Sequence, residues 1–176
     1  TGVQTCALPI YGPSFVAEIE RRFGAKVEIL KGEAEAVYSA LGVLSGIPEA
    51  HGLMGDLGGG SLELAELDRS APQRTVTLPI GSLRLMGNSE GSHKKARKLV
   101  DEALAKADWI RALQGRTFYP VGGAWRALAS VHMAQRDYPL HIIHEYAMEA
   151  NEAIRDRKST RLNSSHIPLS RMPSSA

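Results

Sequence analysis

Apolar residues recur along the chain with two different spacings. Where they lie three or four positions apart they predict helices, because side chains so spaced share one helix face. Short apolar or alternating runs predict strands instead. Helices are expected at residues 13–23, 33–44, 92–113 and 125–133, strands at 26–30, 51–56, 61–66, 75–78 and 118–121, and a polar loop at 69–73. This mixture predicts the α/β fold class.

The two ends of the chain differ from the rest. Residues 1–10 and 156–176 resemble conceptual translations of a DNA sequencing adapter and of its complement. The second stretch is also rich in Ser, Arg and Pro and has no sustained apolar period, which is typical of disorder. We therefore expect neither end to be native and the native part to run from residue 11 to residue 155.

This division changes the charge of the protein. The 176 residues include 21 Lys and Arg against 19 Asp and Glu, a formal net charge of +2. Four of those basic residues and one of the acidic ones fall in 156–176, so residues 11–155 carry a net charge of −1. Bulk charge therefore gives no support to nucleic-acid or membrane binding.

Cysteine content and hydropathy limit the function further. The only cysteine, Cys6, lies in the first adapter-like stretch. Disulfides and cysteine metal sites are therefore not expected, which fits a reducing cytoplasm. No apolar run reaches the length of about 18 residues that a membrane-spanning helix needs.

A glycine-rich turn between two expected strands carries the most informative polar residues. It lies within residues 55–64, GDLGGGSLEL. Without Cβ atoms, the three glycines at 58–60 can adopt positive φ and turn backbone N–H groups towards an anion. Asp56 and Glu63 could hold a hydrated cation or orient water, and Ser61 adds a hydroxyl group. The pattern predicts a phosphate site, with a plain glycine-rich hairpin as the alternative.

Basic residues cluster at 94–98, KKARK, within an expected helix. They could guide a polyanion along the surface, or they could form the solvated face of an amphipathic helix. Trp109 lies close to the apolar face of that helix and is expected in the core. Trp125 follows a glycine turn, where it could pack or line a substrate.

Several motifs together resemble a known family. The stretches 31–36 (KGEAEA), 55–63 and 121–126 (VGGAWR) are similar in order and approximate spacing to the exopolyphosphatase and guanosine pentaphosphate phosphohydrolase family, and 77–84 and 138–144 add to the likeness. The resemblance implies the ribonuclease-H-like fold of the acetate and sugar kinase, heat-shock chaperone and actin superfamily, in which two domains close over a phosphate-bearing substrate. The native part would hold the end of the first domain and most of the second.

The resemblance also implies roles for single residues. Glu35 matches the family's catalytic base, although Lys31 and Ala34 depart from the usual Ser-Gly-x-Glu-Glu-Ala segment. As a base it could accept a proton from water that attacks a terminal phosphorus. Asp56 and Glu63 match acidic residues around a bound cation, and Mg²⁺ is the implied cofactor. The implied phosphate-binding residues are Gly58, Gly59, Gly60, Ser61, Gly122 and Gly123.

Taken without the family, two of these features have plainer interpretations. Glutamate is a common residue on exposed helix faces, so Glu35 could be one more surface side chain. The pair Gly122 and Gly123 could be a tight packing turn between a strand and a helix.

One motif of the family has no counterpart in this sequence. It is the first phosphate loop, Asp-x-Gly-Ser-Asn, and the family's helical C-terminal region is missing as well. We therefore expect a fragment that is inactive alone. The parent enzyme is expected to hydrolyse terminal phosphoanhydride bonds of inorganic polyphosphate or guanosine pentaphosphate in the cytoplasm, as a homodimer because the family commonly dimerises.

Two other functions remain as alternatives. A non-catalytic phosphate- or nucleotide-sensing module of the same superfamily would bind through the loop without a base. An actin-like ATPase or sugar kinase agrees less well with the spacing between Glu35 and Asp56.

Overall fold

The computed structural model describes residues 12–69, 71–140 and 142–154. The predictions for 1–10 and 156–176 therefore lie outside the described residues. The chain divides between Ala124 and Trp125 into two compact units. The predicted α/β class is confirmed, since a mixed sheet carries helices on both faces.

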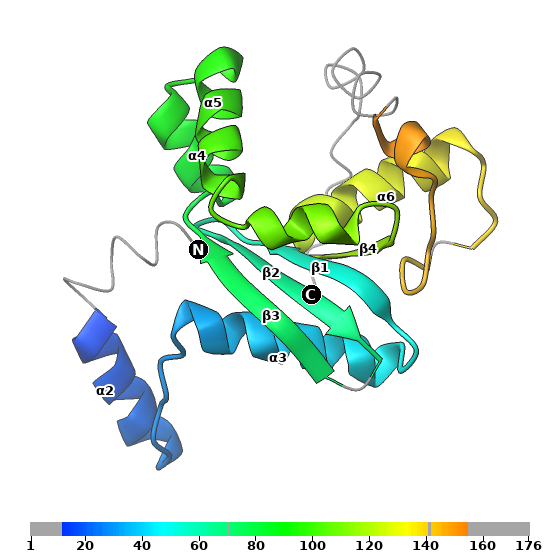
Figure 1. Cartoon of the computed structure of the whole chain (residues 1–176). Helices are drawn as coiled ribbons and strands as arrows, with labels where there is room; N and C mark the ends of the chain where they lie inside the picture. The colour runs from blue at the N-terminus through cyan, green and yellow to red at the C-terminus, as the bar shows by residue number, and fades with distance from the viewer. Residues whose placement is uncertain (1–11, 70, 141, 155–176) are drawn as a thin grey trace, which may run out of the picture. The chain divides into compact units, whose positions relative to one another are not determined.

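The first unit is built on a sheet in the order β3-β2-β1-β4 (Figure 1). β1, β2 and β3 form an antiparallel meander, and β4 pairs in parallel with β1. These strands confirm the ones predicted near the same positions. They span His51–Leu57 (β1), Leu62–Asp68 (β2), Ala71–Leu78 (β3) and Thr117–Val121 (β4).

Helix α3 (Gly32–Gly46) covers one face of this sheet (Figure 1). Ala40 and Leu44 pack there against Met54, Ala65 and Leu67. Alanine leaves little side chain between helix and sheet, and Ala36 and Ala40 are both fully buried. The helix predicted at 33–44 is confirmed, and its apolar stripe holds it close to the strands.

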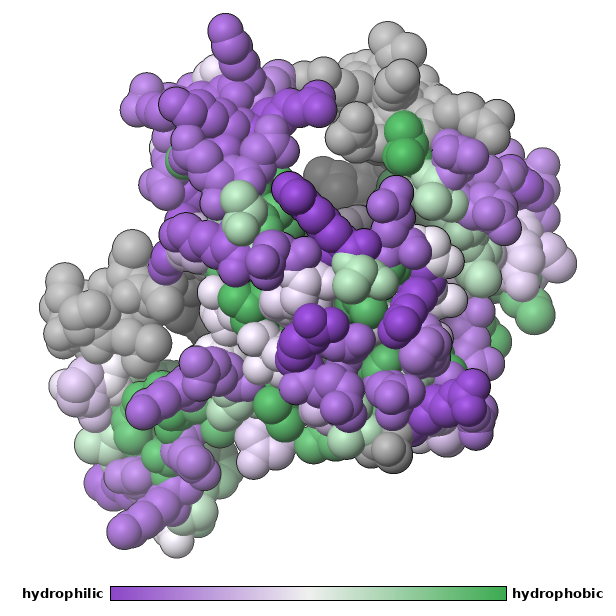
Figure 2. Space-filling model, in the orientation of Figure 1, coloured by the Kyte–Doolittle hydropathy of each residue, from purple (hydrophilic) through white to green (hydrophobic). Residues whose placement is uncertain are grey.

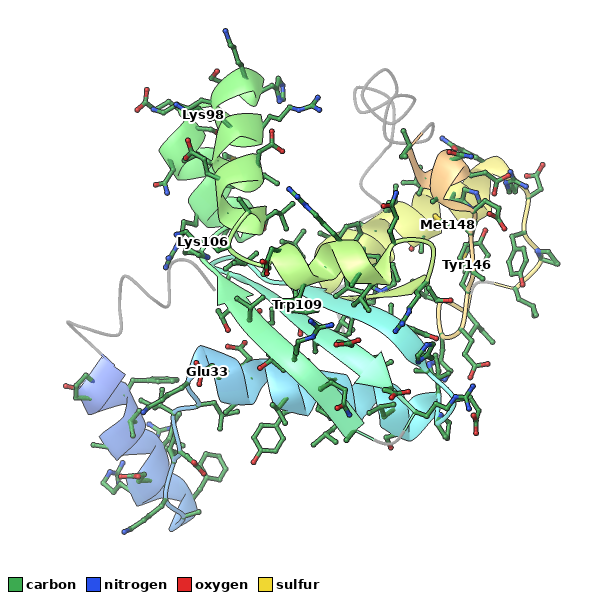
Figure 3. All side chains as sticks on the ribbon, in the orientation of Figure 1. Glu33, Lys98, Lys106, Trp109, Tyr146 and Met148 are labelled. Atoms are coloured by element: carbon green, nitrogen blue, oxygen red, sulfur yellow. The ribbon has the colours of Figure 1, made fainter. Side chains whose placement is uncertain are left out.

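The other face is covered by elements that follow β3. They are α5 (His93–Leu104) and the 3₁₀ helix η1 (Asp108–Leu113), and the short helix α4 (Ser82–Ser89) precedes them in the chain. Leu64 and Leu78 from the sheet form a second core with Ala103, against which Trp109 and Ile110 pack. Figure 3 shows Trp109 over the sheet, and its prediction as a core residue is confirmed.

The strand predicted at 26–30 is wrong. This segment has no regular structure and no sheet partner among the described residues. Ile29 and Leu30 are exposed there. Alternating apolar residues indicate a strand only where another strand can satisfy their backbone groups.

The helix predicted at 92–113 is also wrong in its middle. It stops after Leu104, and η1 starts at Asp108. The break brings Trp109 and Ile110 onto the sheet, so burial of large side chains outweighs helix propensity at this point.

Two smaller predictions need correction. Part of the polar loop expected at 69–73 belongs to β3, where Pro72 lies opposite Leu67 next to an irregularity in the pairing. Helix α4 was not predicted at all.

The predicted helix at 13–23 is confirmed as α2 (Gly12–Phe23), and Gly24 follows it with φ +63°. The basic cluster at 94–98 lies on the exposed face of α5, where Figure 2 shows a hydrophilic surface. Lys95 Nζ lies 2.9 Å from Glu90 Oε1. Arg97 and Lys98 pair with Asp101 and Glu102, one turn further along the helix. These pairs favour the solvated-face interpretation.

The second unit contains most of α6 (Gly123–Gln135), which confirms the helix expected at 125–133. Its buried His132 contacts Tyr146 and Glu152, and Arg136 pairs with the same glutamate. Among the described residues, no helix is both long and apolar enough to cross a bilayer.

Candidate functional site

Both glycine turns lie at one edge of the sheet. β1 and β4 run parallel and end there at Leu57 and Val121, and β2 begins at the same edge. A Cβ on Gly122 would lie only 2.7 Å from the Leu57 carbonyl oxygen, so the second turn touches the end of β1. In open α/β sheets, ligands bind outside the carboxyl ends of the parallel strands.

A row of polar residues crosses the sheet near this edge. Asp56 pairs with Glu63, and Glu63 pairs with Thr77 on β3. Cross-strand partners point to the same face of a sheet. This face is the one that α3 covers, because Met54 and Ala65 on it pack against α3.

Helix α3 carries two further polar groups to the row. Ser39 Oγ donates a hydrogen bond of 2.8 Å to Asp56 Oδ2. Glu35, one turn earlier, is exposed, and its charge acts on Glu63. Figure 3 shows the first turn of α3 at Glu33, two residues before Glu35. The structure therefore brings Glu35, Asp56 and Glu63 together from separate elements.

Glu63 is the most unusual of these carboxylates. It is only 2% exposed, and its Oε1 has no hydrogen-bond partner among the described residues. Burial raises the pKa of Glu63, the negative charges of Glu35 and Asp56 raise it further, and the Ser61 side chain opposes the change. A buried carboxyl oxygen without a partner is costly, unless a ligand completes it.

Helix α4 holds the glycine turn in place. The Ser82 amide donates to the Gly58 carbonyl at 2.9 Å, and the Leu83 and Arg84 amides donate to the Gly59 carbonyl at 2.9 and 3.0 Å. Within the turn the Gly58 amide donates to the Ser61 carbonyl at 3.0 Å. The Gly58 amide is therefore engaged inside the turn in this structure, and its role as a direct phosphate donor stays a prediction.

The donor set suits the implied Mg²⁺. Among the described residues, no group of three or more His, Cys, Asp or Glu side chains is arranged to hold a metal ion. Mg²⁺ however commonly uses only one or two carboxylates and takes its other ligands from water and substrate phosphates. Asp56 and Glu63 are register partners on neighbouring strands, and the unpartnered Oε1 of Glu63 is a hard oxygen donor of this kind.

Three contributors to the site were not found from the sequence. Ser39 lies four residues after Glu35, a spacing that could have indicated a shared helix face. Thr77 and Gly81 lie in the family-like stretch 77–84, but no role was assigned to them, because their importance depends on strand register and on the approach of α4 to the turn.

Comparison with known proteins identifies a family and related folds. The model of the Ppx/GppA phosphatase family matches residues 12–166. Among curated proteins, none matches the chain.

Solved structures show the fold. An exopolyphosphatase from Cytophaga hutchinsonii is 20% identical, with a TM-score of 0.69 over 90% of this chain and 55% of its own. The Aquifex aeolicus member of the Ppx/GppA family is 19% identical, with a TM-score of 0.60 over 86% of this chain and 50% of its own. An exopolyphosphatase-like protein is 27% identical, with a TM-score of 0.53 over 71% of this chain and 44% of its own. The chain thus spans about half the length of these proteins and shares their α/β fold.

Proposed function

The chain belongs to the Ppx/GppA phosphatase family, and on this basis we propose that the whole protein hydrolyses terminal phosphoanhydride bonds of inorganic polyphosphate, of guanosine pentaphosphate, or of both. The observation that carries the proposal is the pairing of Asp56 with the buried Glu63 beside a glycine turn that is hydrogen-bonded to α4. A site of this kind suits a phosphate substrate, whose negatively charged oxygens bind a cation.

Glu35 is the proposed general base. Its exposed carboxylate accepts a proton from water as the water oxygen bonds to the terminal phosphorus. The bond from that phosphorus to the bridging oxygen breaks, and the shortened chain leaves with the bridging oxygen. Asp56 and Glu63 would hold Mg²⁺, which when bound neutralises charge on the phosphate oxygens.

The remaining proposed roles concern binding. The turns at 58–61 and 122–123 position the phosphate oxygens, and Gly122 leaves room next to Asp56 that a side chain would fill. The chain by itself is proposed to be inactive, because the sequence has no counterpart of the family's first phosphate loop.

The test is phosphate release by the full-length protein from polyphosphate and from guanosine pentaphosphate with Mg²⁺. We expect Glu35→Gln to lower kcat about 10²- to 10⁴-fold, the usual contribution of a general base. Glu33→Gln is the matched control, since Glu33 is exposed on the same helix turn, and it should change kcat less than about twofold.

The sensing-module alternative gives a different result. A sensor would bind the phosphate ligand equally well with Glu35 or Gln at this position and would release no phosphate in either form. Release from neither substrate by the full-length protein would refute the hydrolase proposal.

A further inference from the structure

We propose that Ser39 is a positioning residue, which orients the Asp56 carboxylate for its cation and ties the helix of the proposed base to the sheet. This inference rests on the proposed function for its catalytic consequence. Its structural basis is the 2.8 Å hydrogen bond from Ser39 Oγ to Asp56 Oδ2, which joins α3 to β1.

The hydrogen bond from Ser39 fixes Oδ2 of the Asp56 carboxylate, and the turn at 122–123 lies next to Oδ1. A Cβ on Gly122 would lie 3.1 Å from Asp56 Oδ1, so Oδ1 is on the side of that turn. Ser39 therefore holds Oδ2 and leaves Oδ1 directed towards the edge where the two turns meet. Hydrogen bonds to charged acceptors are strong and directional enough to fix such an orientation.

The bond also fixes the position of α3 along the sheet. Beyond the polar row, the helix packs on the sheet through apolar side chains, with Ala36 and Ala40 fully buried and Leu44 nearly so. Apolar contacts are not directional, so the hydrogen bond adds an orientation that the apolar contacts do not supply. Glu35 lies four residues before Ser39 and shares its side of the helix, so the hydrogen bond at Ser39 also restrains the helix turn that carries Glu35.

Residues that orient a metal-binding side chain typically change metal affinity or activity 10- to 100-fold when they are removed. We therefore expect Ser39→Ala to weaken binding of Mn²⁺, used as a spectroscopic substitute for Mg²⁺, by about tenfold. Ser39→Thr keeps the hydroxyl donor and should bind Mn²⁺ within about twofold of the unchanged protein. Ser45→Ala is the matched control, because Ser45 is an exposed serine on the same helix.

The experiment measures Mn²⁺ binding to the full-length protein by electron paramagnetic resonance, without substrate, with circular dichroism to show that each variant is folded. A second comparison places Ser39→Ala in an Asp56→Asn background, where it should have no further effect on Mn²⁺ affinity. Phosphate release against Mg²⁺ concentration then shows whether the half-maximal Mg²⁺ concentration rises in Ser39→Ala.

The inference is overturned if Ser39→Ala binds Mn²⁺ as the unchanged protein does, if Ser39→Thr loses as much affinity as Ser39→Ala, or if Ser39→Ala weakens binding equally when Asp56 is Asn. The Mn²⁺ measurement does not depend on turnover. A protein that binds Mn²⁺ through Asp56 and Ser39 but releases no phosphate would therefore refute the hydrolase proposal and leave this inference intact.

Discussion

Gly81, the residue before α4, should tolerate no side chain. A Cβ at this position would lie 2.3 Å from the Ser61 amide nitrogen and 2.4 Å from the carbonyl carbons of Gly59 and Gly60. All three are backbone atoms of the glycine turn, so none can move away by a side-chain rotation. Gly81 has φ −60°, which any residue adopts, and the cost of Gly81→Ala is therefore purely steric.

The size of the effect follows from what holds the turn. To make room the turn must separate from the start of α4, where the amides of residues 82, 83 and 84 donate to its carbonyls. Each such hydrogen bond contributes about 0.5 to 1.5 kcal/mol net. Loss of two or three of them lowers the free energy of unfolding by about 1 to 4.5 kcal/mol.

The assay is urea unfolding followed by circular dichroism, with Gly87→Ala as control. Gly87 lies in the same helix with nothing within 4 Å of its added Cβ, so alanine there should raise the free energy of unfolding by about 0.5 to 1 kcal/mol. The two variants carry the same chemical change with opposite expected signs. A Gly81→Ala variant within about 0.5 kcal/mol of the unchanged protein would show that the turn is not held as described.

The buried carboxyl and the second turn give further predictions. Since burial raises the pKa of Glu63, the folded state binds its proton more tightly than the unfolded chain does, and stability falls as the pH rises from the ordinary glutamate pKa through the raised one. Unfolding measured over a pH series should therefore show Glu63→Gln gaining stability relative to the unchanged protein across that window, and a difference independent of pH would contradict this reasoning. Gly122→Ala should cost more than Gly115→Ala in the same unfolding assay: both glycines have positive φ, which costs alanine about 1 to 2 kcal/mol, but only Gly122 also meets Leu57 and Asp56. An equal loss of unfolding free energy in the two variants would show that the contacts of Gly122 with Leu57 and Asp56 add no steric cost.

Local patterns in the sequence were sufficient for most of the sheet and for α3. The strands from His51 to Leu78 and the apolar stripe of α3 depend on side chains that face a core, and this periodicity is visible in the residues themselves. The glycine turn could also be predicted, because a run of glycines between two strands indicates a turn without reference to distant residues. Glu35 had to come from family resemblance, because an exposed glutamate on a helix has no distinctive pattern.

The failures have a common physical cause. Helix α4 contains Gly87 and has no side-chain cap at its start, yet its first amides are satisfied by carbonyls of a turn more than twenty residues earlier. The break between α5 and η1 depends on the place that Trp109 takes over the sheet. The bond from Ser39 to Asp56 depends on the position of α3 above β1. Each is decided by contacts between distant segments, which local propensity does not contain.

The mixed connectivity of the sheet has a consequence for the order of folding. β1, β2 and β3 are joined by short turns, so they can pair early with little loss of chain entropy. β4 pairs with β1 across 65 residues of chain, from Gly52 to Thr117, and contacts of such separation form late. The turn at 58–61 would then take shape with the meander, whereas Gly122 reaches Asp56 only when β4 docks. Substitutions in β4 that slow its pairing with β1 would thus delay assembly of the site without delaying formation of most of the sheet.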